Sequence, residues 1–274
     1  MLESFLITSR ETLEASLVIG IVMAYLNRTN NRNYKKNVYY GIALGIIISI
    51  LAAFVFTFIA GEFKGASEVA FEGITMLLGA FLLTTMILWM MQQRHVSKEI
   101  EGKVQKHLTK VKPLLSHFGI FLLVFVVVIR EGIETVIFLN ATNYASKISF
   151  VSGILGIIIA IIIGYLLFMS VKKINLKRLF NVSSVLLILF AAGLVLHGVH
   201  EFVEAKILPG IISPLFDVSN VLSDESIFGS LLKGLFGYVS NPSLLEIISY
   251  IAYLTLILYL YKRIKKSKVN SHTN

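Results

Sequence analysis

Long, uninterrupted runs of hydrophobic residues make up most of the chain, and short polar stretches separate them. Seven runs are long enough to cross a hydrocarbon core of about 30 Å, which takes roughly 20 helical residues. They lie at residues 3–26, 38–60, 67–91, 114–141, 151–171, 179–203 and 243–261. Because the runs are continuous and do not alternate with polar residues, they are typical of helices and not of barrel strands. The pattern predicts an all-α integral membrane protein with seven transmembrane helices.

Composition agrees with this fold class and narrows the possible partners. Hydrophobic residues make up 56% of the chain and charged residues only 15%, against about 25% charged in a soluble domain. The chain has no cysteine, so no thiolate can contribute to a metal site. Arg10 and Glu11 interrupt the first hydrophobic run, and we therefore expect no cleavable signal peptide.

The basic residues predict an orientation in the plasma membrane. The loops after the first, third, fifth and seventh runs, including the C-terminal tail, hold 19 lysines and arginines, and the other loops hold 4. Short cytoplasmic loops are enriched in positive charge, so we expect the N-terminus outside and the C-terminus in the cytoplasm. The net charge of +9 is thus explained by orientation in a lipid bilayer. No nucleic acid partner is expected.

Two similar charged segments lie inside hydrophobic runs. SRETLEA occupies residues 9–15 and IREGIET residues 129–135, and weaker matches follow, such as GIALGIIISI at 41–50 with GILGIIIAII at 153–162. The first three runs therefore resemble the next three. Because each copy has an odd number of spans, the second copy is inserted upside down, as in many secondary transporters.

This inverted repeat predicts the organisation of the chain. We expect a first three-helix repeat at 1–91, a cytoplasmic connector at 92–113 and a second, inverted repeat at 114–204. An extracytoplasmic segment at 205–242 follows, in which we expect short helices over the outer mouth. Residues 243–274 form the seventh helix and a basic tail. Gly41 and Gly45 form a GxxxG pattern that permits close helix packing, with a partner helix that the sequence leaves open.

The two charged segments are predicted to meet near the middle of the membrane. Each lies about ten residues from an expected outer helix end, or roughly 15 Å deep. A charge at the bilayer centre costs about 2.5–3.5 kcal/mol, so these groups must face the protein interior or water. The segments contribute Arg10, Glu11, Glu14, Arg130, Glu131 and Glu134.

Two functions fit these six residues. One is a structural ion-pair network, but four glutamates against two arginines leave an excess of negative charge. The other, which we favour, is a cation site whose carboxylates are oriented by Arg10 and Arg130. Carboxylate oxygens suit Ca²⁺, Mg²⁺, Mn²⁺ or Fe³⁺ better than Cu⁺ or Zn²⁺. The residues alone do not distinguish among these ions.

RETLE and REGIE closely resemble the REGLE signatures of the iron permease family, which includes fungal high-affinity ferric permeases and bacterial EfeU-type permeases. FEGITMLL at 71–78, AAGL at 191–194 and the stretch at 216–238 also resemble the bacterial members. The resemblance implies a plasma-membrane permease that imports iron, in ferric form, with both motifs required. It also implies a partnership with an extracytoplasmic haem peroxidase and an iron-binding lipoprotein. Thr12 and Ile133 depart from the signature, but the charged positions are intact.

Polar residues at expected outer helix ends are candidates for an iron entrance. Glu68 and Glu72 begin the third run, and His200 and Glu204 end the sixth. Glu72 could pass a cation inward, or could simply face the positive end of its helix dipole. His200 and Glu204 could bind arriving iron, since imidazole and carboxylate are both iron ligands, or could simply face water; the family resemblance gives Glu204 the greater weight.

The residues leave two alternative functions open. The same architecture could carry another cation, such as Mn²⁺ or Pb²⁺. A membrane-embedded carboxylate di-iron enzyme is the second alternative, but such sites use Glu-x-x-His in helix bundles, whereas both motifs here have Glu at the fourth position. We therefore expect no enzymatic activity and no cofactor, with iron as the transported substrate.

Overall fold

The computed structural model of the protein describes residues 2–92, 102, 104–105, 113–145, 150–168, 176–224 and 226–270. These residues form helices and connecting turns, with no strand among them. The helices are α1 (Leu2–Arg28), η1 (Arg32–Tyr34), α2 (Lys35–Glu62), α3 (Ala66–Gln92), α5 (Pro113–Ala145), α6 (Phe150–Phe168), α7 (Leu176–Glu204), α8 (Ile227–Phe236) and α9 (Leu244–Asn270).

Each of the seven hydrophobic runs coincides with a long helix, so the expected helical class is confirmed. Four helical stretches are long and apolar enough to cross a membrane by length and composition: Arg32–Glu62, Ala66–Trp89, Ser183–Glu204 and Leu244–Ile264. The charged motifs lie inside α1 and α5, and α6 contributes a shorter apolar stretch, Val151–Leu166. Residues 169–171 of the fifth expected span, and most of the connector at 92–113, lie outside the described residues.

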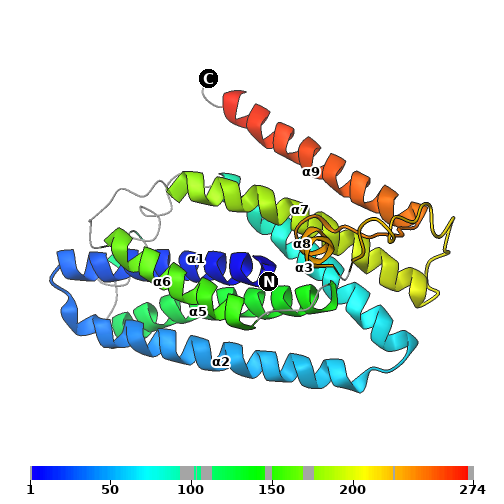
Figure 1. The fold of residues 1–274 in the computed structure, drawn as a ribbon. Coiled ribbons are helices and arrows are strands. Elements are labelled where there is room, and N and C mark those ends of the chain that lie inside the picture. The colour runs from blue at the N-terminus through cyan, green and yellow to red at the C-terminus, as the bar shows by residue number, and fades with distance from the viewer. Residues whose placement is uncertain are drawn as a thin grey trace.

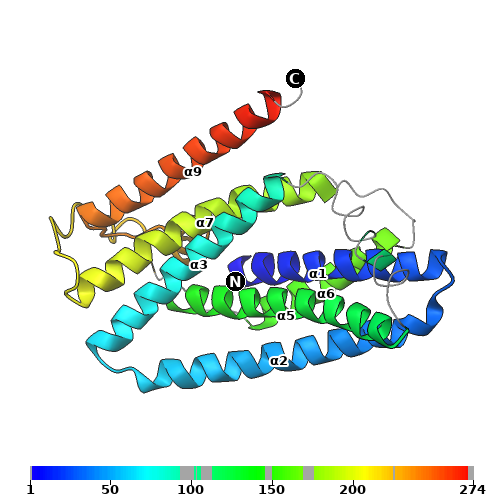
Figure 2. The same ribbon diagram turned by 180° about the vertical axis from the view of Figure 1, so that it is seen from behind.

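The helices pack as pairs that are distant in sequence (Figures 1 and 2). α1 lies along α6, α2 along α5, and α3 along α7, while α1 and α5 touch each other in the middle of the bundle. α9 packs mainly on α7. The bundle therefore brings the two helices that carry the charged motifs side by side.

Small residues set the close contact between α2 and α5. A Cβ atom on Gly41 would lie 2.9 Å from the carbonyl oxygen of Phe121, and one on Gly45 would lie 2.7 Å from Cγ1 of Val128. The GxxxG pattern of α2 thus packs against α5 of the same chain. Hydrophobic side chains on the outer faces of α2, such as Phe54 and Phe58, are exposed, as expected for a surface that faces lipid.

Buried apolar side chains form two clusters on either side of the motifs. One gathers residues of α3, α5 and α7, including Met76, Leu83, Phe138 and Leu194. The other gathers residues of α1, α2 and α5, including Val22, Val38 and Val124. Because closely packed side chains resist movement, the clusters set the distance between α1 and α5 around the motifs in this conformation.

The segment between α7 and α9 contains the short helix α8, which packs against the helices of the bundle. Ser226 caps the start of α8 by accepting a hydrogen bond from the Gly229 amide, and Gly237 ends it with a φ of 68°. α8 packs on α7 and also contacts α1 and α5 (Figure 1). A Cβ atom on Gly193 would lie 2.7 Å from the Cα of Gly237. Because Gly193 is eleven residues before the end of α7, α8 reaches roughly 16 Å below that end.

Candidate metal centre

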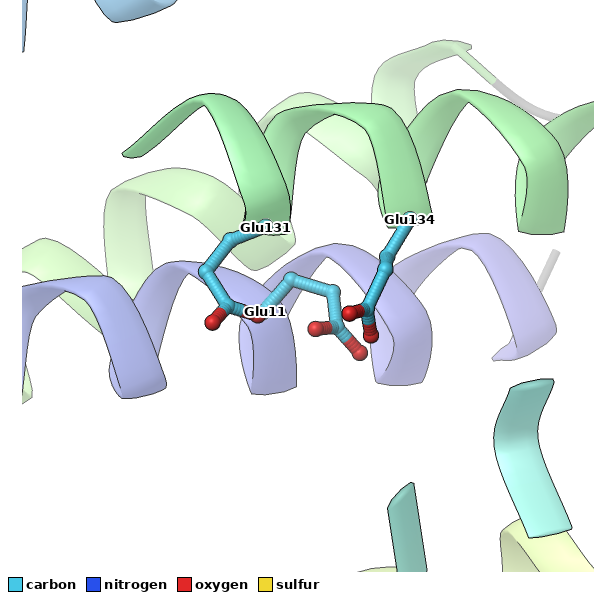
Figure 3. Close-up of side chains that lie close together, drawn as sticks. All are labelled: Glu11, Glu131 and Glu134. Carbon is cyan, nitrogen blue, oxygen red and sulfur yellow. The ribbon is translucent and has the colours of Figure 1, made fainter. Parts of the chain in front are cut away.

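The two charged motifs face each other where α1 and α5 touch. One carboxylate oxygen from each of Glu11, Glu131 and Glu134 lies within 4.8 Å of the other two. Figure 3 shows these side chains projecting from α1 and α5 into the same space. The structure therefore brings together three of the four motif glutamates, although Glu11 is 120 residues from Glu131 in the sequence.

These three carboxylates are shielded from water and share few hydrogen bonds. Glu11 and Glu131 are buried, and Glu134 is half-buried. The Oε2 atoms of all three accept no hydrogen bond from the described residues. Carboxylates at this separation repel one another, and burial increases that cost; ion pairs with Arg10 and Arg130 compensate Glu11 and Glu134 only in part. A hard cation bound between the three side chains would remove both penalties.

Arg10 connects the two glutamates of its own motif. Its Nη1 lies 3.5 Å from Oε1 of Glu11, and its Nη2 lies 3.2 Å from Oε1 of Glu14. Nη1 also donates a hydrogen bond of 3.3 Å to Sδ of Met86 on α3. Glu14 is thus paired with Arg10, and it is not among the three carboxylates that converge.

Arg130 occupies the corresponding place on α5 in a more open environment. Its Nε donates a 2.8 Å hydrogen bond to Oε1 of Glu134, and its side chain is 48% exposed, against 1% for Arg10. Its guanidinium lies over the ring of Trp89, 5.6 Å from the centroid. Both arginines thus form ion pairs with motif glutamates, as expected, but only Arg10 is buried.

Different small residues allow close packing around each motif. A Cβ atom on Gly132 would overlap Ser49 of α2, whose hydroxyl donates to the Gly45 carbonyl. The first motif has Thr12 at this position, and its glycines lie instead on the neighbouring helix. Thr8 of α1 donates a 2.9 Å hydrogen bond to the carbonyl of Gly153 on α6. The departure at Thr12 is therefore compatible with close helix packing.

The outer candidates lie apart from the three converging carboxylates. α3 and α7 cross in close contact, since a Cβ atom on Gly73 would lie 3.0 Å from the carbonyl oxygen of Gly198. The crossing brings Glu72 close enough to Glu204 of α7 for their charges to interact, and Glu68, one turn earlier on α3, also interacts with Glu72. None of these acids, nor His200, belongs to the group formed by the motif glutamates.

The structure adds residues that the sequence did not single out. Met86 contacts Arg10, and Glu246 on α9 accepts a 3.0 Å hydrogen bond from Nδ1 of His200. No sequence signal distinguishes Met86 from other core methionines. Glu246 belongs to a Ser-x-x-Glu pattern that indicates a helix start. The pattern explains the glutamate by itself, so the sequence gives no reason to expect a contact with His200.

Comparison with known proteins then settles the family. The pattern of the iron permease FTR1 family matches residues 1–268. The chain belongs to this family. It is similar to the ferrous iron permease EfeU of Escherichia coli O157:H7, with 31% identity over 259 residues that cover 93% of this chain and 92% of the relative. The ferrous iron permease EfeU of Yersinia pestis is 30% identical over 265 residues, which cover 95% and 93%. No solved structure matches the chain.

Membership of the iron permease family confirms the resemblance inferred from RETLE and REGIE. The family identifies the chain as a transporter, with iron as the transported substrate. The apolar helices agree with a membrane protein. Within this iron permease, the converging carboxylates of α1 and α5 form the candidate metal centre.

Proposed function

We propose that this permease imports iron through a binding site formed by Glu11, Glu131 and Glu134, with Glu14 as a fourth carboxylate. The proposal depends on one observation: two distant motifs place three carboxylate oxygens within 4.8 Å of one another. Shielded oxygen ligands at this separation suit a hard or borderline metal cation. Arg10 and Arg130 orient the carboxylates and reduce the net charge, which limits how tightly the ion is held.

The charge of the site favours ferrous iron. Four glutamates and two arginines carry a formal charge of −4 + 2 = −2 when all are ionised, and one divalent ion neutralises it. The names of the relatives from Escherichia coli and Yersinia pestis also specify ferrous iron. We therefore propose Fe²⁺ as the ion in the site. The resemblance seen in the sequence led us to expect ferric iron instead, and no observation tests that expectation.

The proposed architecture is an inverted repeat of three helices in the plasma membrane, with seven spans and an external N-terminus. The pairing of helices supports it, since α1 packs on α6 as α5 packs on α2. Exchanging the two copies turns one pair into the other. The domain limits are those expected from the sequence: repeats at 1–91 and 114–204, the connector at 92–113, the outer segment at 205–242 and the last helix and tail at 243–274. Rocking of one repeat against the other would open the site to each side in turn.

We place the entrance at the crossing of α3 and α7. Glu68, Glu72, Glu204 and His200 gather near the expected outer ends of these helices. Iron would exchange its first water ligands for these side chains and then move to the motif glutamates. An extracytoplasmic haem peroxidase and an iron-binding lipoprotein are the partners that we propose to deliver it.

Radioactive iron uptake into proteoliposomes tests the function. Fe²⁺, kept reduced without oxygen, and chelated Fe³⁺ are offered separately at two pH values. We expect Fe²⁺ uptake that Glu134→Gln abolishes. The control Glu62→Gln alters an exposed carboxylate at the end of α2 and should transport normally. Full transport by Glu134→Gln would contradict the proposed site, and faster uptake of Mn²⁺ or Pb²⁺ than of iron would favour the alternative cations.

The carboxylate di-iron enzyme is a weaker alternative. Such centres bind two ions through Glu-x-x-His pairs, and the converging group contains carboxylates but no histidine. A Mössbauer spectrum of the purified protein that shows two magnetically coupled irons, together with their failure to be released to solution, would favour this alternative.

A further inference from the structure

Glu246 is a buried acid on α9, the helix outside the proposed repeat. It is 2% exposed. Its Oε1 accepts two hydrogen bonds, one of 3.0 Å from Nδ1 of His200 on α7 and one of 2.7 Å from Oγ of Ser243. The last helix therefore provides a buried partner for an exposed polar group of the outer entrance.

This contact fixes the tautomer of His200 when the ring is neutral. A carboxylate oxygen can only accept a hydrogen bond, so the hydrogen of the neutral imidazole must be on Nδ1. The lone pair is then on Nε2, which lies 4.0 Å from Oε2 of Glu204. His200 and Glu204 are both exposed at this end of α7. A carboxylate that accepts from one imidazole nitrogen while the other is free to bind is the usual arrangement behind a metal-ligating histidine.

We propose that Nε2 of His200 and the carboxylate of Glu204 form an outer site for a divalent first-row transition ion, with Glu246 as its positioning residue. The inference rests on the proposed function, because it assumes that iron enters at this end of α7. The separation of 4.0 Å suits a shared ion, since two metal–ligand bonds of about 2.1 Å span up to roughly 4.2 Å. Water would fill the other coordination positions.

Such a site would supply a selectivity that the motif glutamates lack. Carboxylates alone also bind Ca²⁺ and Mg²⁺. An imidazole ligand favours iron and its transition-metal neighbours over these ions. Two protein ligands also give weak binding, which allows the ion to move on. His200 would therefore select the ion before it reaches the carboxylate site.

A purely structural role for Glu246 is the competing explanation. Ser243 precedes α9, and the Glu246 amide donates a 3.4 Å hydrogen bond to its Oγ, as in a helix cap. A cap accounts for the contact with Ser243 but requires nothing of His200. It predicts that Ser243→Ala and Glu246→Gln have the same effects, whereas the outer site predicts different ones.

Competition by Ca²⁺ in the uptake assay separates the two explanations. We expect the Ca²⁺ concentration that halves iron uptake to be lower by roughly tenfold or more in Glu246→Gln and in His200→Gln than in the wild type. Altering the hydrogen-bond partner of a metal ligand usually weakens metal binding by such a factor. Ser243→Ala should lower the melting temperature but keep the wild-type Ca²⁺ sensitivity. Wild-type sensitivity in both Glu246→Gln and His200→Gln would overturn the proposal, as would equal sensitivity in Ser243→Ala.

A binding measurement tests the outer site without transport. Co²⁺, a coloured substitute for Fe²⁺, is titrated into detergent-purified full-length protein that carries Glu131→Gln and Glu134→Gln, which disable the motif site. We expect the visible absorption of Co²⁺ to differ from that of the hydrated ion, and we expect Ca²⁺ not to reverse this difference. The Kd for Co²⁺ should rise roughly tenfold or more on adding Glu246→Gln, and with His200→Gln the spectrum should remain that of the hydrated ion. A spectrum that His200→Gln leaves unchanged, or no difference from hydrated Co²⁺ at all, would overturn the outer site while leaving the proposed motif site untouched.

Discussion

Glu11 on α1 and Glu131 on α5 bring carboxylate oxygens within 4.8 Å of each other. A charged carboxylate on either helix by itself would add an unfavourable free energy of membrane insertion. Together with Glu134 they form a shared group of carboxylates, which we propose to be the iron site. The four motif glutamates are not equivalent, because Glu14, which is paired with Arg10, is not among the three that converge.

Glu131→Gln should impair iron uptake more than Glu14→Gln. Glu131 is one of the three converging carboxylates, and the substitution removes its charge and replaces one of its two oxygens with nitrogen. We expect a loss above the roughly 10–100-fold that follows from altering groups behind a metal ligand, and a loss within that range for Glu14→Gln. Initial rates of uptake, normalised to the amount of protein in the vesicles, measure both. Equal losses would contradict the lesser role given to Glu14, which is paired with Arg10 and is not among the three converging carboxylates.

Arg10 should matter more for stability than Arg130. Arg10→Ala leaves Glu11 and Glu14 buried without their cation, and breaking a buried ion pair costs about 3–5 kcal/mol. Arg130 is half-exposed, so Arg130→Ala should cost less than about 1 kcal/mol from its ion pair. Thermal unfolding in detergent compares the two variants. A larger loss of stability for Arg130→Ala would contradict the burial described for Arg10.

Gly132→Ala should separate α5 from α2. The new methyl group would overlap Ser49, and overpacking of this kind costs about 1–3 kcal/mol. Because Gly132 adjoins Glu131, we expect lower uptake as well as a lower melting temperature. The second substitution Ser49→Gly makes room for the methyl group and should restore part of both. Gly61→Ala is the control, since nothing lies within 4 Å of its added Cβ atom; failure of Ser49→Gly to restore either property would count against this packing.

The meeting of the motifs was predictable because two regularities coincide in the sequence. RETLE and REGIE share their charged positions, and each lies about ten residues from an expected outer helix end. Equal depth brings such groups together once the helices are adjacent. The position of Glu14 was not predictable, because Arg10 pairs with both Glu11 and Glu14 and also contacts Met86 from another helix.

Two other features depend on contacts that periodicity does not encode. Glu246 contacts His200 across 46 positions, and its pattern with Ser243 resembles an ordinary helix start. The depth of α8 depends on Gly193 and Gly237, and glycine pairs of this kind leave no periodic signal. The membrane orientation, by contrast, was derived from loop charge alone and stays a prediction.

Single cysteines can test that orientation directly, because the chain has none of its own. Val221 is 88% exposed in the segment between α7 and α9, which we place outside. Asn31 lies between α1 and α2, a loop that we place in the cytoplasm. In intact cells, a membrane-impermeant maleimide should label Val221→Cys and should label Asn31→Cys only after the membrane is permeabilised, because the charged reagent cannot cross the bilayer. The reverse pattern would invert the proposed topology and place α8 and the outer site on the cytoplasmic side, which would contradict their proposed role in the entrance for iron.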